Sequence, residues 1–401
     1  MSELSYLEKL LDGVKVEWKA LGKVLKRTKG TKITAGQMKA LHKDNAPLKI
    51  FAGGKTVAFV DFKDIPEKDI NREPSIIVKS RGIIEFEYYD KPFSHKNEMW
   101  SYHSNNDAIS IKYIYYFLKI NEGYFQQIGG KMQMPQIATP DTDKFEVPIP
   151  CPDNPEKSLA IQSEIVRILD KFTALTAELT AELNMRKKQY NYYRDQLLSF
   201  DEEQEKPIYL EKLLDGVEVE WLPLSDLARI RNGKDHKSLS EGEFPVYGSG
   251  GIMRYVDTYA YNKPSVLIPR KGSLGNLFFI DVPFWTVDTI FYTEIDEAQI
   301  RPKYLYYFLS TVGLGEMNQA GGVPSQTQSV LNKLKIPIPC PDNPEKSLAI
   351  QSEIVRILDK FDTLTNSITE GLPREIELRQ KQYEYYRDLL FSFPKPETVS
   401  N

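Results

Sequence analysis

Two stretches of the chain place apolar residues at alternating intervals of four and three, a pattern typical of a helix that packs one face along a partner. Each stretch follows an Asn-Pro pair, at Asn154 and Asn343. The asparagine can cap the helix, and a proline at the first helical position loses no hydrogen bond. We predict long helices over about 154–199 and 343–393, the second one kinked or broken at Gly371-Leu372-Pro373. The apolar seams consist of Ile161, Ile165, Ile168, Phe172, Leu175 and Leu179, and of Ile350, Ile354, Ile357, Phe361, Leu364 and Ile368.

The regions that precede these helices have a different pattern, with short runs of β-branched and aromatic residues that indicate strands. Two similar segments, Lys112–Leu118 and Lys303–Leu309, predict amphipathic helices whose tyrosines belong to a core or its rim. The sequence therefore predicts a mixed α/β fold. The expected strands are Ser75–Val78, Ile83–Tyr89, Ser265–Ile268, Leu277–Ile280 and Thr289–Thr293.

Parts of the chain occur twice. Pro148–Phe172 returns letter for letter as Pro337–Phe361, and Tyr6–Trp18 returns as Tyr209–Trp221 with only one substitution. The sequences between the copies are much less alike. Constant segments indicate one task done twice, and divergent segments indicate two different objects recognised. We expect a first variable domain over 1–146, a helical spacer over 147–200, a linker and second variable domain over 201–335, and a second helix with a tail over 336–401.

Two such helices in one chain most simply pack on each other. After an internal duplication they would run antiparallel as a coiled coil, with one variable domain at each end and a pseudo-twofold relation between the halves. The alternative is that each helix packs on its own domain as a dimerisation arm.

Composition places the chain among globular proteins with enough length for two cores: hydrophobic residues make up 41% of 401 and charged residues 27%. We expect a cytoplasmic protein because no apolar run approaches a membrane span and Cys151 and Cys340 occupy matching, unpaired places in the repeat. The net charge is −4, yet the segment from Lys19 to Val60 holds ten lysines or arginines and one acid, Asp44. A basic segment of this kind is either a solvated surface or the binding face for an anionic partner.

Signatures of catalysis are mostly absent. Ala52–Thr56 resembles the end of a phosphate-binding loop, but its leading glycine would be at position 49, which is lysine. The four histidines lack zinc spacing, and we predict no metal and no cofactor on this chain. Glycine-rich, polar and cationic loops remain, with residue types that contact phosphates and base edges. Such contacts are expected at Lys26, Arg27, Lys29, Lys32, Gly53, Gly54, Lys55, Arg81, Lys131, Gln133, Arg231, Lys234, Lys237, Gly250, Gly251, Arg254, Arg270, Lys271, Ser325 and Gln326.

The order variable, constant, variable, constant resembles the DNA-specificity subunit of type I restriction–modification systems over nearly the whole chain. The resemblance rests on ILDKF within each repeat, on the YLEKLLDG elements, on the closing RKKQYNYYRDQLLSF and RQKQYEYYRDLLFSF, and on PVYGSGGIMRY, PSVLIPRKGSLGN and GGVPSQTQ in the second variable region. The first variable region departs from the family where GKMQMPQ replaces the usual G-V-P-S-type loop.

This resemblance implies two target-recognition domains, each of which reads one half of an asymmetric, bipartite duplex DNA target. It also implies that the helices set the gap and bind two methyltransferase subunits, that restriction/translocase subunits join the complex, and that AdoMet, ATP and Mg²⁺ belong to those partners. The tandem TAELTAEL of Thr176–Leu183 then becomes a length adjuster, since four residues add about 6 Å of helix. Two alternatives stay open: a non-catalytic coiled-coil adaptor whose variable domains bind proteins, and a self-sufficient nuclease or methyltransferase.

Overall fold

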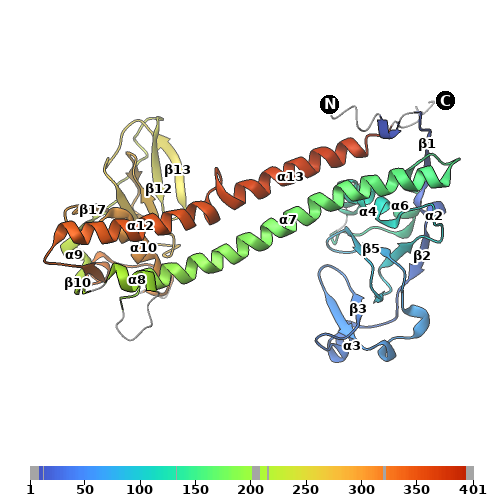
Figure 1. Ribbon diagram of the computed structural model, residues 1–401, viewed down its shortest axis with the longest axis horizontal. Coiled ribbons are helices and arrows are strands. Elements are labelled where there is room, and N and C mark those ends of the chain that lie inside the picture. Colours follow the sequence, from blue (N-terminus) through green and yellow to red (C-terminus); the bar gives the residue numbers. More distant parts are fainter. Residues whose placement is uncertain are drawn as a thin grey trace. The chain divides into compact units, whose positions relative to one another are not determined.

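The chain folds into two compact units that do not follow its linear order. A computed structural model describes residues 9–11, 13–131, 133–200, 208–214, 216–318 and 322–393 (Figure 1). Unit 1 comprises Met1–Glu178 and Glu377–Asn401, and unit 2 comprises Leu179–Ile376. Both long helical regions are therefore shared between the units. Residues 377–393 of the second helical region therefore group with the first domain.

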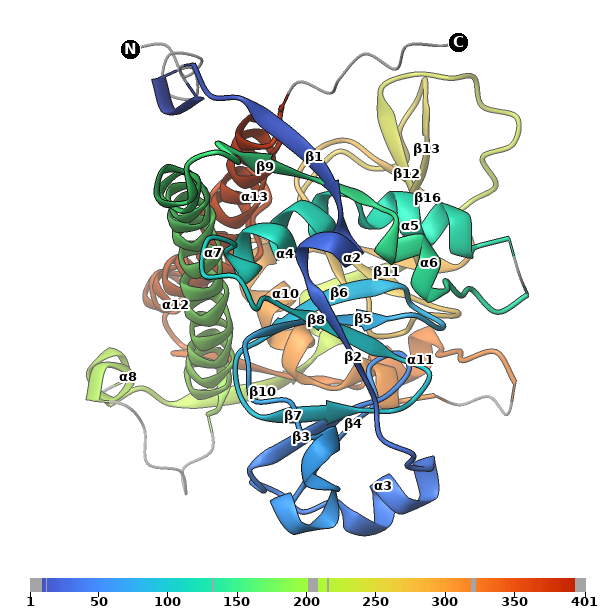
Figure 2. The same cartoon turned by 90° about the vertical axis from the view of Figure 1, so that its right-hand side faces the viewer.

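Unit 1 contains three small sheets. Strand β1 pairs with β9 antiparallel, so the segment after position 146 closes the first domain rather than opening the spacer. A four-stranded sheet has the order β2-β8-β5-β6, and a three-stranded sheet has the order β4-β3-β7 (Figure 2). The strands are β1 (Val16–Ala20), β2 (Lys26–Lys29), β3 (Leu48–Phe51), β4 (Val57–Val60), β5 (Ser75–Lys79), β6 (Glu85–Tyr89), β7 (Phe93–His95), β8 (Trp100–His103) and β9 (Glu146–Pro150).

Unit 2 repeats this topology strand for strand. Its sheets have the orders β10-β18, β11-β17-β14-β15 and β13-β12-β16, and the pairing partners run in the same senses as in unit 1. The expected duplication of one mixed α/β fold is thereby confirmed. The strands are β10 (Val219–Pro223), β11 (Ala228–Asn232), β12 (Phe244–Gly248), β13 (Gly251–Val256), β14 (Ser265–Pro269), β15 (Phe278–Ile280), β16 (Trp285–Thr286), β17 (Ile290–Ile295) and β18 (Lys335–Pro339).

Short helices complete each unit. In unit 1, α4 covers β5 and β6, and in unit 2, α10 covers β14 and β15. The expected strands and both tyrosine-rich helices are thus confirmed, and Tyr113, Tyr116, Tyr304 and Tyr307 are buried as core residues. The helices are α2 (Leu21–Val24), α3 (Ala35–Leu41), η1 (Phe62–Asp64), η2 (Glu67–Asp69), α4 (Ile111–Ile120), α5 (Glu122–Gly129) and α6 (Thr139–Asp143) in unit 1, and α8 (Ile208–Leu213), α9 (Leu224–Leu227), α10 (Pro302–Thr311), η3 (Leu314–Glu316) and α11 (Gln328–Leu331) in unit 2.

The long helices begin and break where the sequence predicts. Helix α7 (Pro155–Leu198) has 44 residues, and the second region divides into α12 (Pro344–Asn366) and α13 (Gly371–Leu390). The Asn154 side chain accepts a hydrogen bond from the backbone N–H of Lys157 at 3.0 Å. Gly371 has a φ of 76°, and a Cβ there would lie 2.4 Å from the carbonyl oxygen of Thr363. The break therefore requires glycine at this position.

The two helical regions pair antiparallel. In unit 1, the rings of Phe172 and Tyr386 stack at 5.3 Å, and in unit 2, those of Phe361 and Tyr193 stack at 5.4 Å. As the residue number rises along α7, that of its partner falls. The expected antiparallel coiled coil is confirmed by these pairs, while the pseudo-twofold relation of the halves stays a prediction. None of the described helices is long and apolar enough to cross a membrane.

Each helix also packs on its own domain. Ile161 and Ile165 are buried in the core of unit 1, as Ile350 and Ile354 are in unit 2. The next fully buried residues are Leu169 and Leu358, whereas the predicted seam residues Ile168 and Ile357 are only partly buried. In each unit, residues of the partner helix belong to the same core cluster: Leu390 lies with Ile161 and Leu169 in unit 1, and Leu197 lies with Ile350 and Leu358 in unit 2. The buried stripe of each helix is therefore broader than the predicted seam.

Two further seam predictions need correction. Ile368 is 78% exposed because it lies in the break between α12 and α13, outside either helix. Leu175 lies in α7 but is 37% exposed, at the edge of the seam. Leu179 and Leu364 are half-buried.

Candidate nucleic-acid interface

Identical side chains of the repeated helix attach it to each variable domain. Gln162 is fully buried: its Oε1 accepts from the backbone N–H of Ser110 at 2.9 Å, and its Nε2 donates to the carbonyl of Ala108 at 3.0 Å. Gln351 makes the same two bonds in unit 2, from the N–H of Arg301 at 2.8 Å and to the carbonyl of Gln299 at 3.0 Å. These backbone groups lie at the start of α4 and of α10. The glutamine therefore fixes where each variable domain sits on its helix.

A second attachment uses the aspartate of the ILDKF motif. Asp170 accepts from Lys112 Nζ at 2.7 Å and from the Tyr116 hydroxyl at 2.5 Å. Burial and this carboxylate raise the pKa of Tyr116 well above its usual value, so the phenol stays protonated as the donor. In unit 2, Asp359, Lys303 and Tyr307 repeat the arrangement at 2.8 and 2.6 Å. The constant helices thus hold both variable domains through the same side chains.

Two loops at the end of each four-stranded sheet share their backbone hydrogen bonds between the units. In unit 1, the N–H of Gly82 donates to the carbonyl of Pro135 at 2.9 Å, and in unit 2, that of Gly272 donates to Pro324 at 2.8 Å. Both glycines have positive φ, 75° and 82°. This backbone frame is the same in both units, although the sequences around it differ.

The frame shows which side chains correspond. Arg81 forms an isolated antiparallel β-bridge with Gln136 in unit 1, and Lys271 forms one with Ser325 in unit 2. The Arg81 Nε donates to Gln136 Oε1 at 3.2 Å, and the arginine is exposed. Gln136 was not among the contacts predicted from the sequence, whereas Gln133, three residues earlier, was. The Pro-polar pairs Pro135-Gln136 and Pro324-Ser325 were the available signal.

The structure corrects one predicted contact residue. Gln326 is 1% exposed, and its Nε2 donates to the carbonyl of Pro269 at 2.6 Å. A side chain held in this way supports the loop and cannot reach a base edge. The Oε1 of Gln326 is buried and has no hydrogen-bond partner among the described residues.

In unit 2 the glycine hairpin lies beside these loops. Gly250 and Gly251 lie at the turn between β12 and β13, and the preceding Ser249 donates its N–H to Thr289 Oγ1 at 3.3 Å. The carbonyl of Thr289 accepts from the N–H of Arg270 at 2.8 Å. The structure thus brings together the predicted residues Gly250, Gly251, Arg270, Lys271 and Ser325.

Other predicted residues lie apart from these loops. Arg231 pairs with Glu294 at 2.9 Å on the face of the four-stranded sheet, and Arg254 donates to the carbonyl of Leu239 at 3.1 Å. Arg27 lies 3.7 Å from Asp143, so these three arginines already have protein partners. The remaining predicted side chains are exposed: Lys26, Lys29 and Lys32 in and after β2, Lys55 beside Gly53 and Gly54 in the β3–β4 turn, Lys131 and Gln133 after α5, and Lys234 and Lys237 after β11.

The described residues contain no cluster of three histidine, cysteine or acidic side chains that could hold a metal ion. What the site offers instead is two backbone frames of one design with different polar and cationic side chains. These features define a duplicated recognition protein, in which one scaffold presents two unlike surfaces.

Comparison with known proteins identifies the family. The model of the type I restriction modification DNA specificity domain matches residues 15–186 and again 216–378. The specificity subunit of the type I restriction enzyme EcoR124I/EcoR124II of Escherichia coli is 42% identical over the full length of both chains. That of EcoprrI, also from Escherichia coli, is 35% identical over 92% of this chain and 93% of its own.

The fold agrees with this relation. The crystal structure of the type I restriction–modification S subunit from M. genitalium has a TM-score of 0.64 at 19% identity and covers 96% of this chain and 98% of its own. The chain belongs to the family of type I restriction–modification DNA-specificity subunits, which the motifs in its sequence predicted. It is a targeting subunit rather than a catalytic one.

Proposed function

We propose that each unit of this specificity subunit reads one half of an asymmetric, bipartite duplex DNA target. One observation carries the proposal. The two loop frames share their backbone bonds, but they present Arg81 with Gln136 in one unit and Lys271 with Ser325 in the other. Because the backbone is the same, both loops can approach a groove of the DNA in the same way. Because the side chains differ, they can contact different bases.

The repeated helices supply two equal surfaces for partners. The two copies of the repeat expose the same positions in both units. Arg167 pairs with Glu164 as Arg356 pairs with Glu353, each at 2.6 Å. Identical surfaces fit two copies of one partner, which we assign to the methyltransferase subunit. The restriction/translocase subunits join through that complex, and AdoMet, ATP and Mg²⁺ bind to the partners.

A methylation map of chimeric subunits tests the half-site assignment. The complex of this chain with its methyltransferase subunit is expressed in a methylation-free host, and modified adenines are located by single-molecule sequencing. Exchange of residues 19–146 for those of a relative with another target should change one half of the motif. Exchange of 222–335 serves as the matched control and should change only the other half. A change in both halves, or in neither, contradicts the proposal.

The adaptor alternative receives no support from the described structure. A protein-binding adaptor needs no matched pair of polar loops, and its binding to duplex DNA should be absent. DNA binding that weakens as salt rises separates the two functions.

A further inference from the structure

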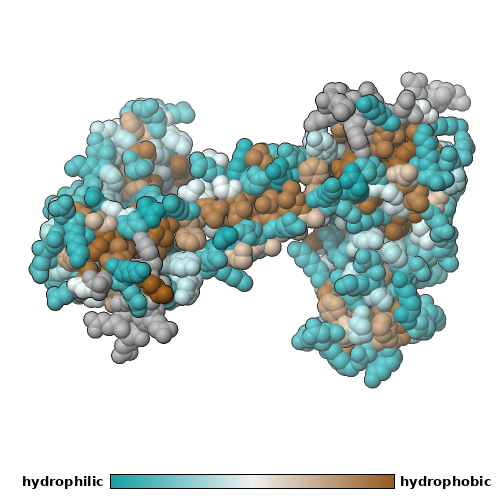
Figure 3. Space-filling view, in the orientation of Figure 1, coloured by the Kyte–Doolittle hydropathy of each residue, from teal (hydrophilic) through white to brown (hydrophobic). Residues whose placement is uncertain are grey.

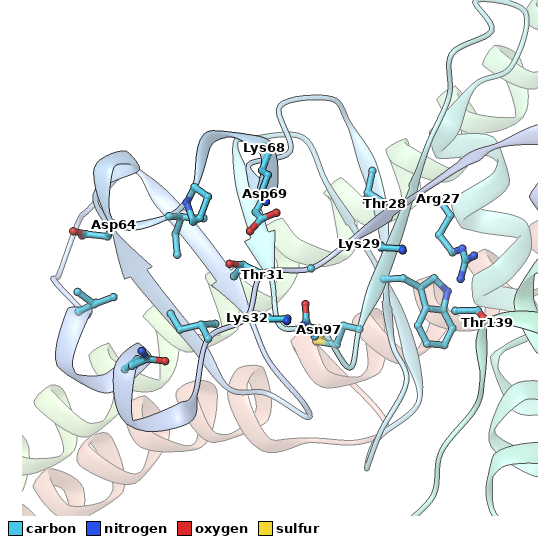
Figure 4. A pocket seen from close by; sticks show the side chains of 18 residues that line it. Arg27, Thr28, Lys29, Thr31, Lys32, Asp64, Lys68, Asp69, Asn97 and Thr139 are labelled. Atoms are coloured by element: carbon cyan, nitrogen blue, oxygen red, sulfur yellow. The ribbon is translucent and has the colours of Figure 1, made fainter.

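Unit 1 contains a basic groove beside the two loops that carry Arg81 and Gln136, here called the reading loops. The groove has a volume of about 850 Å³ and lies between the end of β2, helix α3 and the η1–η2 segment (Figure 4). Its lining includes the cationic side chains of Arg27, Lys29, Lys32 and Lys68. The three lysines are exposed, and within the described ranges none of them forms an ion pair. Asp64 and Asp69 also line the groove, so its lining carries a net charge of +2.

The groove is built from segments that unit 2 has in shorter form. Residues 33–47 lead to β3 over 15 residues and contain α3, whereas residues 236–243 lead to β12 over 8. Residues 61–74 follow β4 over 14 residues and contain η1 and η2, whereas residues 257–264 follow β13 over 8. The two shorter connections are described throughout and contain no helix.

The cationic positions are not shared either. Lys29 pairs with Trp100 in β8, and in the same register Asn232 pairs with Phe291 in β17. The N–H of Thr31 donates to His95, and that of Lys234 donates to Thr286, so the residues that follow, Lys32 and Asp235, correspond. An asparagine and an aspartate thus replace two of the groove lysines in unit 2.

The groove lies at the same end of the sheet as the reading loop. Lys29 pairs with Trp100, and Trp100 pairs with Val78, one residue before the end of β5, which leads into the loop that carries Arg81. Neighbouring strands are about 4.8 Å apart, so the backbones of Lys29 and Val78 are about 10 Å apart. The groove and the Arg81 loop are therefore close enough to face one bound duplex.

We propose that this groove binds the sugar-phosphate backbone of the target duplex, on the flank of the bases that the Arg81 loop reads. The proposal rests on the proposed function and deepens it for one unit. Lysines act as point charges for phosphates, which position a protein without carrying sequence information. Hydrophilic side chains cover most of the surface around α3 on the face shown in Figure 3.

The two variable domains also differ in net charge. Residues 19–146 hold 21 lysines and arginines and 15 acidic residues, a net charge of +6. Residues 222–335 hold 12 and 11, a net charge of +1. The larger positive charge therefore lies on the domain that contains the groove, as the proposal expects.

Salt titration of the assembled complex tests the groove. The dissociation constant for the target duplex is measured from 50 to 200 mM salt for the wild type and for a Lys29→Ala, Lys32→Ala, Lys68→Ala variant. Three phosphate contacts contribute about 2.7 to the slope of log K against log salt. The slope of the variant should be shallower by this amount. The ratio of its dissociation constant to that of the wild type should therefore fall about 40-fold between 50 and 200 mM salt. Its methylated motif should be unchanged, which also shows that unit 1 is folded.

A charge-matched control removes three exposed lysines that do not line the groove, by Lys63→Ala, Lys91→Ala and Lys144→Ala. A slope change equal to that of the groove variant overturns the proposal, since it reports only the net charge of unit 1. An unchanged slope in the groove variant overturns it as well. If the wild-type complex shows no specific DNA binding, the proposed function itself fails, which is a distinct result.

Neutral methylphosphonate linkages locate the contact. Single substitutions along the flank of the first half-site should weaken wild-type binding at a few adjacent linkages. The groove variant should be insensitive at those same linkages. Equal sensitivity of both proteins at every linkage contradicts a backbone contact in the groove.

Discussion

Replacement of Gln162 by leucine should loosen unit 1 while unit 2 stays intact. Leucine is similar in size to glutamine but cannot bond the backbone N–H of Ser110 or the carbonyl of Ala108. Both groups are partly buried, and each lost bond costs about 1 kcal/mol, which gives about 2 kcal/mol together. This free energy corresponds to an opening of α4 that is about 30-fold more frequent.

Hydrogen exchange followed by mass spectrometry measures this effect in peptides of α4 and α10 from the same sample. The Gln162→Leu variant should raise the exchange rates at the start of α4 about 30-fold and leave those of α10 unchanged. Gln351→Leu is the matched control, because Gln351 makes the same bonds to Arg301 and Gln299. It should show the reverse. Equal changes in both helices, or unchanged rates in both variants, would refute the assignment of these glutamines as attachment points.

Three other perturbations have defined outcomes. Arg81→Ala should cost about 1–3 kcal/mol of discrimination and relax one half of the methylated motif, with Lys271→Ala affecting only the other half; an unchanged motif in both variants contradicts the loop assignment. A third TAEL unit after Thr176–Leu183 lengthens α7 by about 6 Å and should widen the gap while both half-sites persist, whereas altered half-sites at constant spacing would contradict this role. Burial lowers the pKa of His95 from 6.5 to about 4, so between these pH values the unfolded chain binds a proton that folded unit 1 does not. The unfolding free energy of unit 1 should therefore fall by about 3 kcal/mol as pH falls through this window, and His95→Thr, which copies Thr286 of unit 2, should flatten the profile measured by denaturant titration.

Local patterns in the sequence determined most of the secondary structure. The Asn-Pro starts, the break at Gly371 and the tyrosine-rich helices were predictable, because caps, fixed backbone angles and apolar periodicity act within a few residues. The exact repeat also predicted a duplicated fold, since equal sequences in equal contexts form equal structures. The family motifs extended this prediction to the class of protein.

The tertiary structure decided which residues share a surface. Gln136 takes the place of Ser325 only because its loop pairs with Gly82 and Arg81, more than fifty residues earlier in the chain. Gln326 is buried for the same reason, since its partner is the carbonyl of Pro269. A pattern of residue types cannot show which distant backbone groups a polar side chain will satisfy.

Packing of the long helices was decided in the same way. The sequence gives one narrow apolar seam, but the folded chain buries a broader stripe, which the domain core and the antiparallel helix cover together. That is why Leu169 and Leu358 are fully buried, and why Ile368, beyond the end of α12, is exposed. The apolar period determines that a helix has a buried side, and only the folded chain determines what covers it.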